Sequence, residues 1–343
     1  MRGVLLPGGR RVEWADRPVP AAGHGQVLLR VRASSICGSD IRAIYLEHLG
    51  HGPEAYQGVI AGHEPAGEVV EVGPGCRRLH VGDRVAVYHI AGCGLCPNCR
   101  AGYMIGCHDA SRAAYGWQRD GGHAQFLLAE EVTCLALPDS LSFIDGASAA
   151  CSAGTAYEAL LRIGAGGRDR LLVTGLGPVG LAVALLAQGL GLRTIVGTDP
   201  SPERRALAES LGVVSRALPG DASAEDVCAA AGGPVEVSID ASGTASGRTL
   251  ALGALADFGR CAFVGEGGAV SFEPSPILIH KQITLVGSWV TSLPHMAELL
   301  DRLDRWDLHP ERLVTDRFPL DDAAAAYELA DRGTAGKVCL VTD

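Results

Sequence analysis

The order of apolar and helical segments after residue 170 constrains the fold of this chain more than any other feature. Leu171–Thr174 is a short apolar run, and a segment of helical character follows at 178–191. The same alternation repeats with the run Thr194–Thr198 and the helical segment Pro202–Leu211. Further strand-like runs lie at 235–240, 260–264 and 283–288. Buried strands that alternate with helices are typical of a parallel, doubly wound α/β sheet, which we predict here.

A glycine-rich turn joins the first of these strands to its helix. Gly175, Gly177 and Gly180 form the pattern GxGxxG. The first glycine permits a tight turn, the second lets a pyrophosphate approach the backbone, and the third lets helix and strand pack closely. Asp199 ends the next strand, where a carboxylate accepts hydrogen bonds from ribose hydroxyls and repels a 2′-phosphate. The pattern predicts an NAD site; a structural turn without a ligand is the alternative.

The helix after this turn presents free N–H groups to the phosphates. Arg204 and Arg205 follow the aspartate, and a cation there favours a phosphate, which counts against a strict preference for NAD over NADP. We assign six further residues to the predicted coenzyme site: Pro178, Val179, Arg204, Val264, Gly265 and Ser288.

Residues 1–150 follow a different pattern, with short strands between Gly and Pro turns. Strands are expected at 26–33, 66–72, 83–87 and 123–129, in an antiparallel, barrel-like domain. After residue 290 we expect helices at 296–306 and 321–332, and an edge strand at 336–341. The predicted domains are therefore 1–151, 152–290 and a return segment, 291–343, to the first domain.

The overall composition excludes several classes of protein. A length of 343 residues favours two domains, and a net charge of −10 disfavours a nucleic-acid or anionic-membrane partner. The N-terminus lacks the pattern of a signal peptide, and glycines and a proline interrupt the longest apolar stretch, so we expect no membrane span and a cytoplasmic protein. The odd count of 11 cysteines indicates reduced or metal-bound thiols rather than disulfides.

The most specific pattern in the chain is a group of four cysteines, Cys93, Cys96, Cys99 and Cys107, in a lobe at 92–108. Four thiolates at this spacing suit a closed tetrahedral zinc site that has no vacancy for a substrate, and so has a structural role. An iron–sulfur cluster also takes four cysteines and is the alternative.

These motifs occur in a characteristic order with three others: Cys37-Gly-Ser-Asp40, Gly62-His63-Glu64-Pro-Ala-Gly67-Glu68, and Val81-Gly-Asp83-Arg-Val. Together they resemble the zinc-containing medium-chain alcohol dehydrogenase family over essentially the whole chain. The resemblance implies a GroES-like, β-rich catalytic domain, a Rossmann coenzyme domain, NAD, and two zinc ions per chain. It also implies a homodimer or homotetramer.

The resemblance implies a catalytic zinc with three protein ligands and one open position. Cys37, His63 and Cys151 match the ligands, and Glu64 is expected beside the metal as a transient ligand. Ser39 matches the hydroxyl that takes the alcohol proton. We expect Asp40 to orient His63 through its other ring nitrogen.

The next member of the proton relay in classical family members is a histidine, but this chain has Arg42 there. Since arginine stays protonated, it cannot act as a base, and the proton must leave by water, by ribose hydroxyls or through another group such as His48 or His51. Cys151 separates the chain from many polyol dehydrogenases, which have Glu at that point.

The predicted substrate is a secondary alcohol of a polyol or aminocyclitol. The expected pocket lining is polar and aromatic: Tyr45, Glu47, His48, His51, Glu54 and Tyr56. Residues 112–124 and Tyr88-His89-Ile90 resemble dehydrogenases that oxidise 2-deoxy-scyllo-inosamine in antibiotic pathways. Sorbitol- and threonine-type dehydrogenases are alternatives, and a zinc-binding, non-catalytic family member is the alternative from another class.

Overall fold

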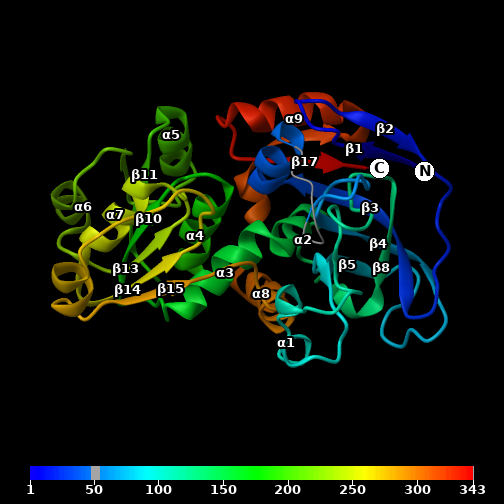
Figure 1. The fold of residues 1–343 in the computed structure, drawn as a ribbon, viewed down its shortest axis with the longest axis horizontal. Helices are drawn as coiled ribbons and strands as arrows, with labels where there is room; N and C mark the ends of the chain where they lie inside the picture. The colour runs from blue at the N-terminus through cyan, green and yellow to red at the C-terminus, as the bar shows by residue number, and fades with distance from the viewer. Residues whose placement is uncertain (48–54, 343) are drawn as a thin grey trace. The chain divides into compact units, whose positions relative to one another are not determined.

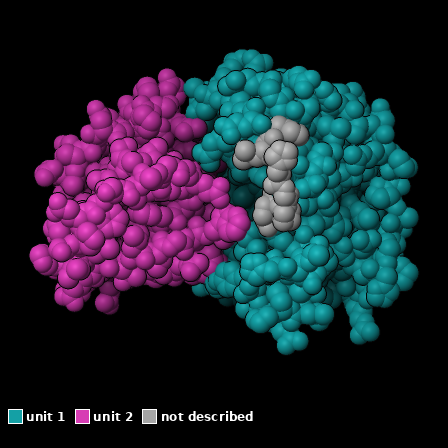
Figure 2. Space-filling view, viewed as in Figure 1, with its two compact units in different colours: residues 1–154, 291–343 teal, residues 155–290 magenta. Residues whose placement is uncertain are grey.

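The computed structural model describes residues 1–47 and 55–342. The chain divides into two compact units (Figure 2): residues 1–154 with 291–343, and residues 155–290. The sequence pattern places the first boundary after residue 151, three residues before the break between these units. Each unit has its own sheet and its own hydrophobic core.

The second unit is a six-stranded parallel sheet in the order β12-β11-β10-β13-β14-β15 (Figure 1). The chain starts at the centre and winds outward in both directions, as predicted for a doubly wound sheet. Its strands are β10 (Arg170–Thr174), β11 (Thr194–Asp199), β12 (Arg216–Pro219), β13 (Val235–Asp240), β14 (Leu255–Phe263) and β15 (Thr284–Gly287).

Helices connect these strands, and their starts follow capping rules. Pro178 and Pro202 begin α4 and α5, at the first helical position where a missing N–H costs nothing. Ser223 and Asp226 form a capping box at the start of α6. The helices are α3 (Ser152–Arg162), α4 (Pro178–Gly189), α5 (Pro202–Ser210), α6 (Ala224–Ala231), α7 (Ala245–Gly253) and the π-helical turn η4 (Ser275–Ile279).

The first unit is built on a seven-stranded sheet in the order β16-β17-β3-β4-β5-β9, with β8 paired to β3. Its strands are β3 (Gln26–Ile36), β4 (Glu64–Val72), β5 (Arg84–Val87), β8 (Phe126–Glu130), β9 (Cys134–Ala136), β16 (Val314–Pro319) and β17 (Lys337–Val341). Two two-stranded antiparallel sheets accompany it: β1 (Arg2–Leu5) with β2 (Glu13–Asp16), and β6 (Ile90–Ala91) with β7 (Ala113–Ala114). The predicted fold class, a GroES-like domain with a Rossmann-type domain, is confirmed.

Short helices link the strands of the first unit. They are α1 (Pro97–Arg100), α2 (Phe143–Ala150), α8 (Leu293–Trp306), α9 (Ala323–Arg332), η1 (Asp40–Leu46), η2 (Met104–Gly106), η3 (Glu131–Thr133), η5 (Pro310–Leu313) and η6 (Leu320–Asp322). Within the described residues, no helix is both long and apolar enough to cross a membrane.

The prediction of an edge strand at 336–341 is wrong. β17 pairs with β16 on one side and with β3 on the other, so β16 is the edge. An exposed edge strand would leave Lys337, its first residue, in solvent, but Lys337 is only 2 % exposed. A buried lysine in an interior strand needs a charged partner, and that partner lies in the candidate site.

Candidate functional site

The structure brings four sequence-predicted residues together in the first unit. Ligand atoms of Cys37, His63, Glu64 and Cys151 all lie within 4.8 Å of one another. Cys37 follows the end of β3, His63 and Glu64 lie at the start of β4, and Cys151 ends α2. Three segments far apart in sequence therefore present two thiols, an imidazole and a carboxylate to one point.

Asp40 fixes the geometry of two of these residues. His63 Nδ1 donates a hydrogen bond to Asp40 Oδ1 at 2.8 Å, and the backbone N–H of Cys37 donates to Oδ2 at 3.0 Å. The predicted contact of Asp40 with His63 is present. Burial alone would favour the neutral imidazole, but Asp40 raises the pKa of His63. Because Nδ1 donates to Asp40, a metal would bind at Nε2 and would displace the proton that the raised pKa favours there.

The two thiols of the cluster are electrostatically linked. A hydrogen bond between them lowers the pKa of Cys37 well below its usual value and raises that of Cys151. A cation bound between them needs both as thiolates, and its binding releases the shared proton.

Glu64 forms a buried ion pair with Lys337. Lys337 Nζ lies 2.6 Å from Glu64 Oε1, and both side chains are almost fully buried. Burial raises the pKa of Glu64. Burial lowers the pKa of Lys337, but the nearby carboxylate of Glu64 outweighs this effect, and the pKa of Lys337 is raised. The second oxygen, Oε2, is buried and has no hydrogen-bond partner in the described part of the chain. The sequence analysis did not identify Lys337. The available signal was its rarity, because this arginine-rich chain has only one other lysine, Lys281.

His89 is a second residue whose position the sequence did not predict. Its ring centroid lies 5.2 Å from that of His63, and its Nδ1 donates to the carbonyl of Ala150 at 2.8 Å. Burial and the neighbouring His63 lower the pKa of His89 to about 3. The ring is therefore neutral, with Nε2 left as a hydrogen-bond acceptor close to the cluster.

The donor set of the cluster fits a zinc ion. Two sulfurs and an imidazole nitrogen are the ligand types of catalytic zinc, and Asp40 provides the outer carboxylate that commonly orients a ligating histidine. The unpartnered Oε2 of Glu64 is a further donor within reach of the same point. Cys37, His63 and Cys151 would hold the ion.

The four cysteines of the lobe also come together. Ligand atoms of Cys93, Cys96, Cys99 and Cys107 lie within 4.8 Å of one another. Backbone N–H groups of Leu95 and Cys96 point at Cys93 Sγ and lower its pKa to about 7. All 11 cysteines lie in the described residues, and none is in a disulfide. Four sulfurs around one point fit a structural zinc.

The glycine-rich turn of the second unit has the geometry that its sequence predicts. Gly175 has a φ of +90°, and a Cβ on Gly180 would lie 1.8 Å from the carbonyl oxygen of Gly175. Asp199 Oδ2 accepts a hydrogen bond from the N–H of Leu176 at 2.8 Å. The aspartate therefore also holds the turn in place, a structural duty that sequence spacing did not reveal.

The other residues assigned to the coenzyme site surround this turn or the neighbouring strand ends. Pro178 and Val179 begin α4, and Arg204 Nη1 lies 3.8 Å from Asp199 Oδ2. The N–H groups of Val264 and Gly265 donate to the carbonyl of Asp240, whereas Ser288 follows β15 and has a buried hydroxyl.

Comparison with known proteins assigns the chain to a family. Residues 23–139 match the alcohol dehydrogenase GroES-like domain, and residues 178–305 match the zinc-binding dehydrogenase family. The zinc-type alcohol dehydrogenase-like protein YphC of Escherichia coli (strain K12), itself uncharacterized, is 47 % identical over 346 residues, which cover 99 % of this chain and 98 % of that protein. The chain belongs to the zinc-containing medium-chain alcohol dehydrogenase family. Members are NAD(P)-dependent oxidoreductases that act on CH–OH groups.

Two further relatives illustrate the range of the family. An L-threonine 3-dehydrogenase of Shewanella loihica (strain ATCC BAA-1088 / PV-4) is 30 % identical over 96 % of this chain and 95 % of that protein. The solved structure of the alcohol dehydrogenase TADH from Thermus sp. ATN1 has a TM-score of 0.90 at 30 % identity and covers 100 % of both chains. None of these three relatives has an aminocyclitol in its name, so the antibiotic-pathway assignment has no support from them and stays a prediction.

The predicted lining of the substrate pocket fits the structure poorly. Tyr45 and Tyr56 lie in a hydrophobic core cluster, and the Tyr56 hydroxyl bonds to the backbone of Val59. Glu47 is exposed, whereas His48, His51 and Glu54 lie outside the described residues.

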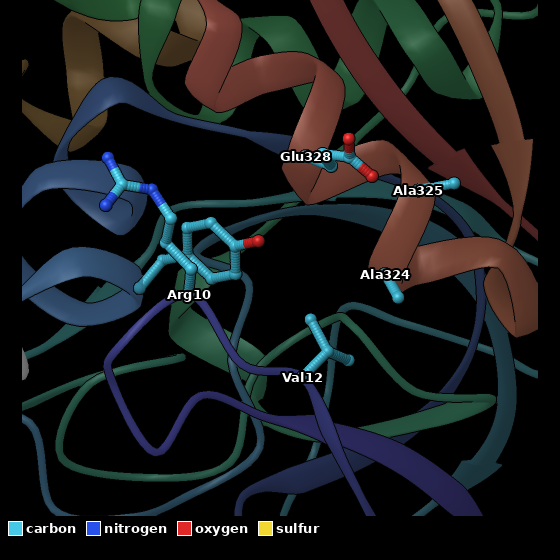
Figure 3. Close-up of a pocket in the computed structure, with 6 residues that line it drawn as sticks. Arg10, Val12, Ala324, Ala325 and Glu328 are labelled. Carbon is cyan, nitrogen blue, oxygen red and sulfur yellow. The ribbon is translucent and has the colours of Figure 1, made fainter.

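Tyr45 also borders a cavity of about 480 Å³ that has no part in the metal cluster. Its walls come from the segment after β1 and from helix α9 (Figure 3). Both charged residues of the lining are paired, Arg10 with Asp331 and Glu328 with Arg332. This cavity therefore has no spare charge with which to recognise a polar ligand.

Proposed function

We propose that this chain oxidises a polar secondary alcohol to a ketone, with NAD⁺ as the hydride acceptor and zinc at Cys37, His63 and Cys151. The observation that carries the proposal is the buried cluster of two thiols and an imidazole oriented by Asp40. A carboxylate that orients a ligating imidazole is the arrangement expected of a working metal centre. The glycine turn and Asp199 of the second unit support a dinucleotide as the co-substrate.

The chemistry divides between the bound groups and the protein. When bound, zinc would supply a Lewis acid that lowers the pKa of an alcohol, and NAD⁺ would supply the hydride acceptor. Asp40 holds His63 in one tautomer and orientation, and the half-buried Ser39 hydroxyl receives the proton of the alcohol. Arg42 is exposed and permanently charged, so the proton passes from Ser39 to solvent or to another acceptor.

His89 and Glu64 favour a polar substrate. His89 Nε2 is a neutral acceptor on a ring beside His63, and the unpartnered Oε2 of Glu64 adds a carboxylate oxygen next to the same histidine. A polyol hydroxyl or a protonated amine donates to such groups, whereas an aliphatic alcohol leaves them unpaired at a cost of about 1–3 kcal/mol each. We therefore favour polyols and amino alcohols, with aminocyclitols, sorbitol and threonine as the candidates to compare.

The test is a substrate panel read as NADH formation at 340 nm. The proposal predicts turnover of at least one polyol or amino alcohol with kcat/KM at least 10-fold above that of ethanol or 2-propanol. His89→Phe should reduce the ratio of kcat/KM for the polar substrate to kcat/KM for the simple alcohol, because the phenyl ring keeps the volume of the side chain and removes the hydrogen-bond acceptor. A preference for simple alcohols in the wild type would contradict the substrate class and leave the alcohol dehydrogenase activity standing.

The non-catalytic alternative predicts a different result. A protein that binds zinc only for structure would show no NADH formation with any substrate and no protection by NAD⁺ against heat. NAD⁺ that binds only the folded state raises the melting temperature in a concentration-dependent way. Absence of both effects would contradict the proposed function.

A further inference from the structure

The end of strand β13 carries a buried carboxylate with an unusual number of donors. Asp240 is fully buried, and its side chain accepts hydrogen bonds from the Thr174 hydroxyl at 2.9 Å, from the N–H and hydroxyl of Ser242, and from the N–H of Gly243. Thr174 is the last residue of β10, directly before the glycine turn. Asp240 therefore links the end of β10 to the loop after β13.

Arg248, on helix α7, extends this link to a third loop. Its Nε lies 3.4 Å from Asp240 Oδ2, and Nη2 donates to the carbonyl of Gly265 at 2.8 Å. Nη1 donates to the carbonyl of Gly268. One guanidinium thus bridges the carboxylate and two carbonyls of the loop 264–268, the loop that follows β14.

The three loops contact one another through their backbones, without intervening side chains. A Cβ on Gly175 would lie 2.8 Å from the N of Ser242. A Cβ on Gly265 would lie 2.2 Å from the N of Gly243, and one on Gly243 would lie 2.2 Å from the carbonyl oxygen of Glu266. A shift of the loop 264–268 is therefore transmitted directly to the loop after β13 and from there to the glycine turn.

We propose that Arg248 is a positioning residue for the coenzyme: its guanidinium holds the loop 264–268 and the glycine turn in the conformation that binds the dinucleotide. The proposal rests on the proposed function, because it assumes that the carboxyl edge of this sheet binds NAD. That edge is where open α/β sheets bind their ligands.

The contacts of Arg248 explain why it acts through the loops rather than on the coenzyme. Nη1 and Nη2 donate to two backbone carbonyls, Nε forms an ion pair with Asp240 without a hydrogen bond, and the side chain is 13 % exposed. Two carbonyls and a carboxylate around one guanidinium suit its planar fork, which the single ammonium of lysine does not reproduce. Arg248→Lys should therefore retain the charge and lose the bridge.

The experiment measures NADH binding by fluorescence titration for the wild type, Arg248→Met, Arg248→Lys and Arg260→Met. Arg260 is the matched control: it pairs with Asp169 at 2.8 Å, at the amino end of β10 and so away from the loops. We expect both Arg248 variants to weaken NADH at least 10-fold, to raise KM for NAD⁺ similarly and to change kcat less than threefold. Arg260→Met should bind NADH within threefold of the wild type.

Amide hydrogen exchange provides a readout that a general loss of stability would not reproduce. In Arg248→Lys, exchange should rise in residues 264–268 and 241–243 and stay unchanged in β10 and β11. If Arg248→Met fails to fold, Arg248→Lys alone decides the question. NADH binding within threefold of the wild type in Arg248→Lys would overturn the positioning role. A wild type that does not bind NADH would instead contradict the proposed function itself.

Discussion

Removal of the buried cation Lys337 tests the electrostatics of the candidate site. Lys337→Met keeps most of the apolar stem and removes the partner of Glu64, with which it pairs at 2.6 Å. The remaining carboxyl is fully buried, so it either stays charged without a partner or takes up a proton. Breaking a buried pair in this way is strongly destabilising.

The magnitude follows from the cost of protonating a carboxyl. The cost is about 1.4 kcal/mol for each pH unit above the ordinary glutamate pKa of about 4.3. At pH 7 the total is therefore about 3–4 kcal/mol. At pH 5 the same cost falls to about 1 kcal/mol. Burial already raises the pKa of Glu64 in the wild type, so this cost is an upper limit for the effect of the substitution. Lys337→Met should therefore lose about 1–3 kcal/mol of unfolding free energy at pH 7 and much less at pH 5.

The assay is urea unfolding of the chelator-treated protein at pH 7 and pH 5. The double variant Glu64→Gln/Lys337→Met removes both charges and should recover most of the loss at pH 7. Lys281→Met is the control, because Lys281 donates to the backbone carbonyls of Gly253 and Leu255 and not to a carboxylate. The stability lost in this variant should be the same at pH 5 and pH 7. A Lys337→Met loss below about 1 kcal/mol at pH 7, or one equal at both pH values, would refute the reasoning.

Three further substitutions, the first with a matched control, test the packing, the ligand orientation and the pH response. Gly62→Ala should cost roughly 2–6 kcal/mol in urea unfolding, because φ is +93° and the new Cβ would lie 2.3 Å from His123 Cδ2. Gly58→Ala, at φ +67° with no atom within 4 Å, should cost only about 1–2 kcal/mol, and equal losses would contradict the steric account. Asp40→Asn should weaken zinc roughly 10–100-fold in a chelator competition, and unchanged affinity would exclude its role in orienting His63. Asp145 raises the pKa of His309, with Asp307 adding to the effect, so this contact stabilises the fold below the ordinary histidine pKa and is lost as the pH rises through the raised value. The melting-temperature advantage of the wild type over His309→Gln should therefore shrink between pH 6 and pH 9, and a constant difference would contradict the assignment.

Local sequence patterns predicted the parts of the molecule that depend on short-range geometry. The glycine turn follows from its position between a strand and a helix, and the four-cysteine lobe from spacing within a single loop. The contact of Asp40 with His63 followed from pairing a candidate ligand with a carboxylate close to another candidate ligand, Cys37, in the sequence.

Long-range partnerships were not accessible in the same way. Lys337 and Glu64 are separated by 273 residues, and a lysine in an alternating run normally indicates a solvent-facing position. The same pattern led to the wrong edge assignment of β17. Arg248 has no motif of its own, because its role depends on three loops that meet only in the folded sheet. Tyr45 and Tyr56 were assigned to the substrate pocket by their polarity, but both rings pack in the core, and the cavity that Tyr45 borders includes no residue of the metal cluster.

The central claim is a zinc ion at Cys37, His63 and Cys151 that the reaction requires, in addition to the one in the four-cysteine lobe. Zinc content per chain, measured together with NADH formation, tests this claim most directly. The account predicts about two ions in the wild type, and about one ion with no turnover in Cys151→Ser. Cys261→Ser, which alters a buried cysteine outside both clusters, should keep both the zinc and the activity. A wild type with a single ion, or a Cys151→Ser variant that keeps two ions and full activity, would contradict it.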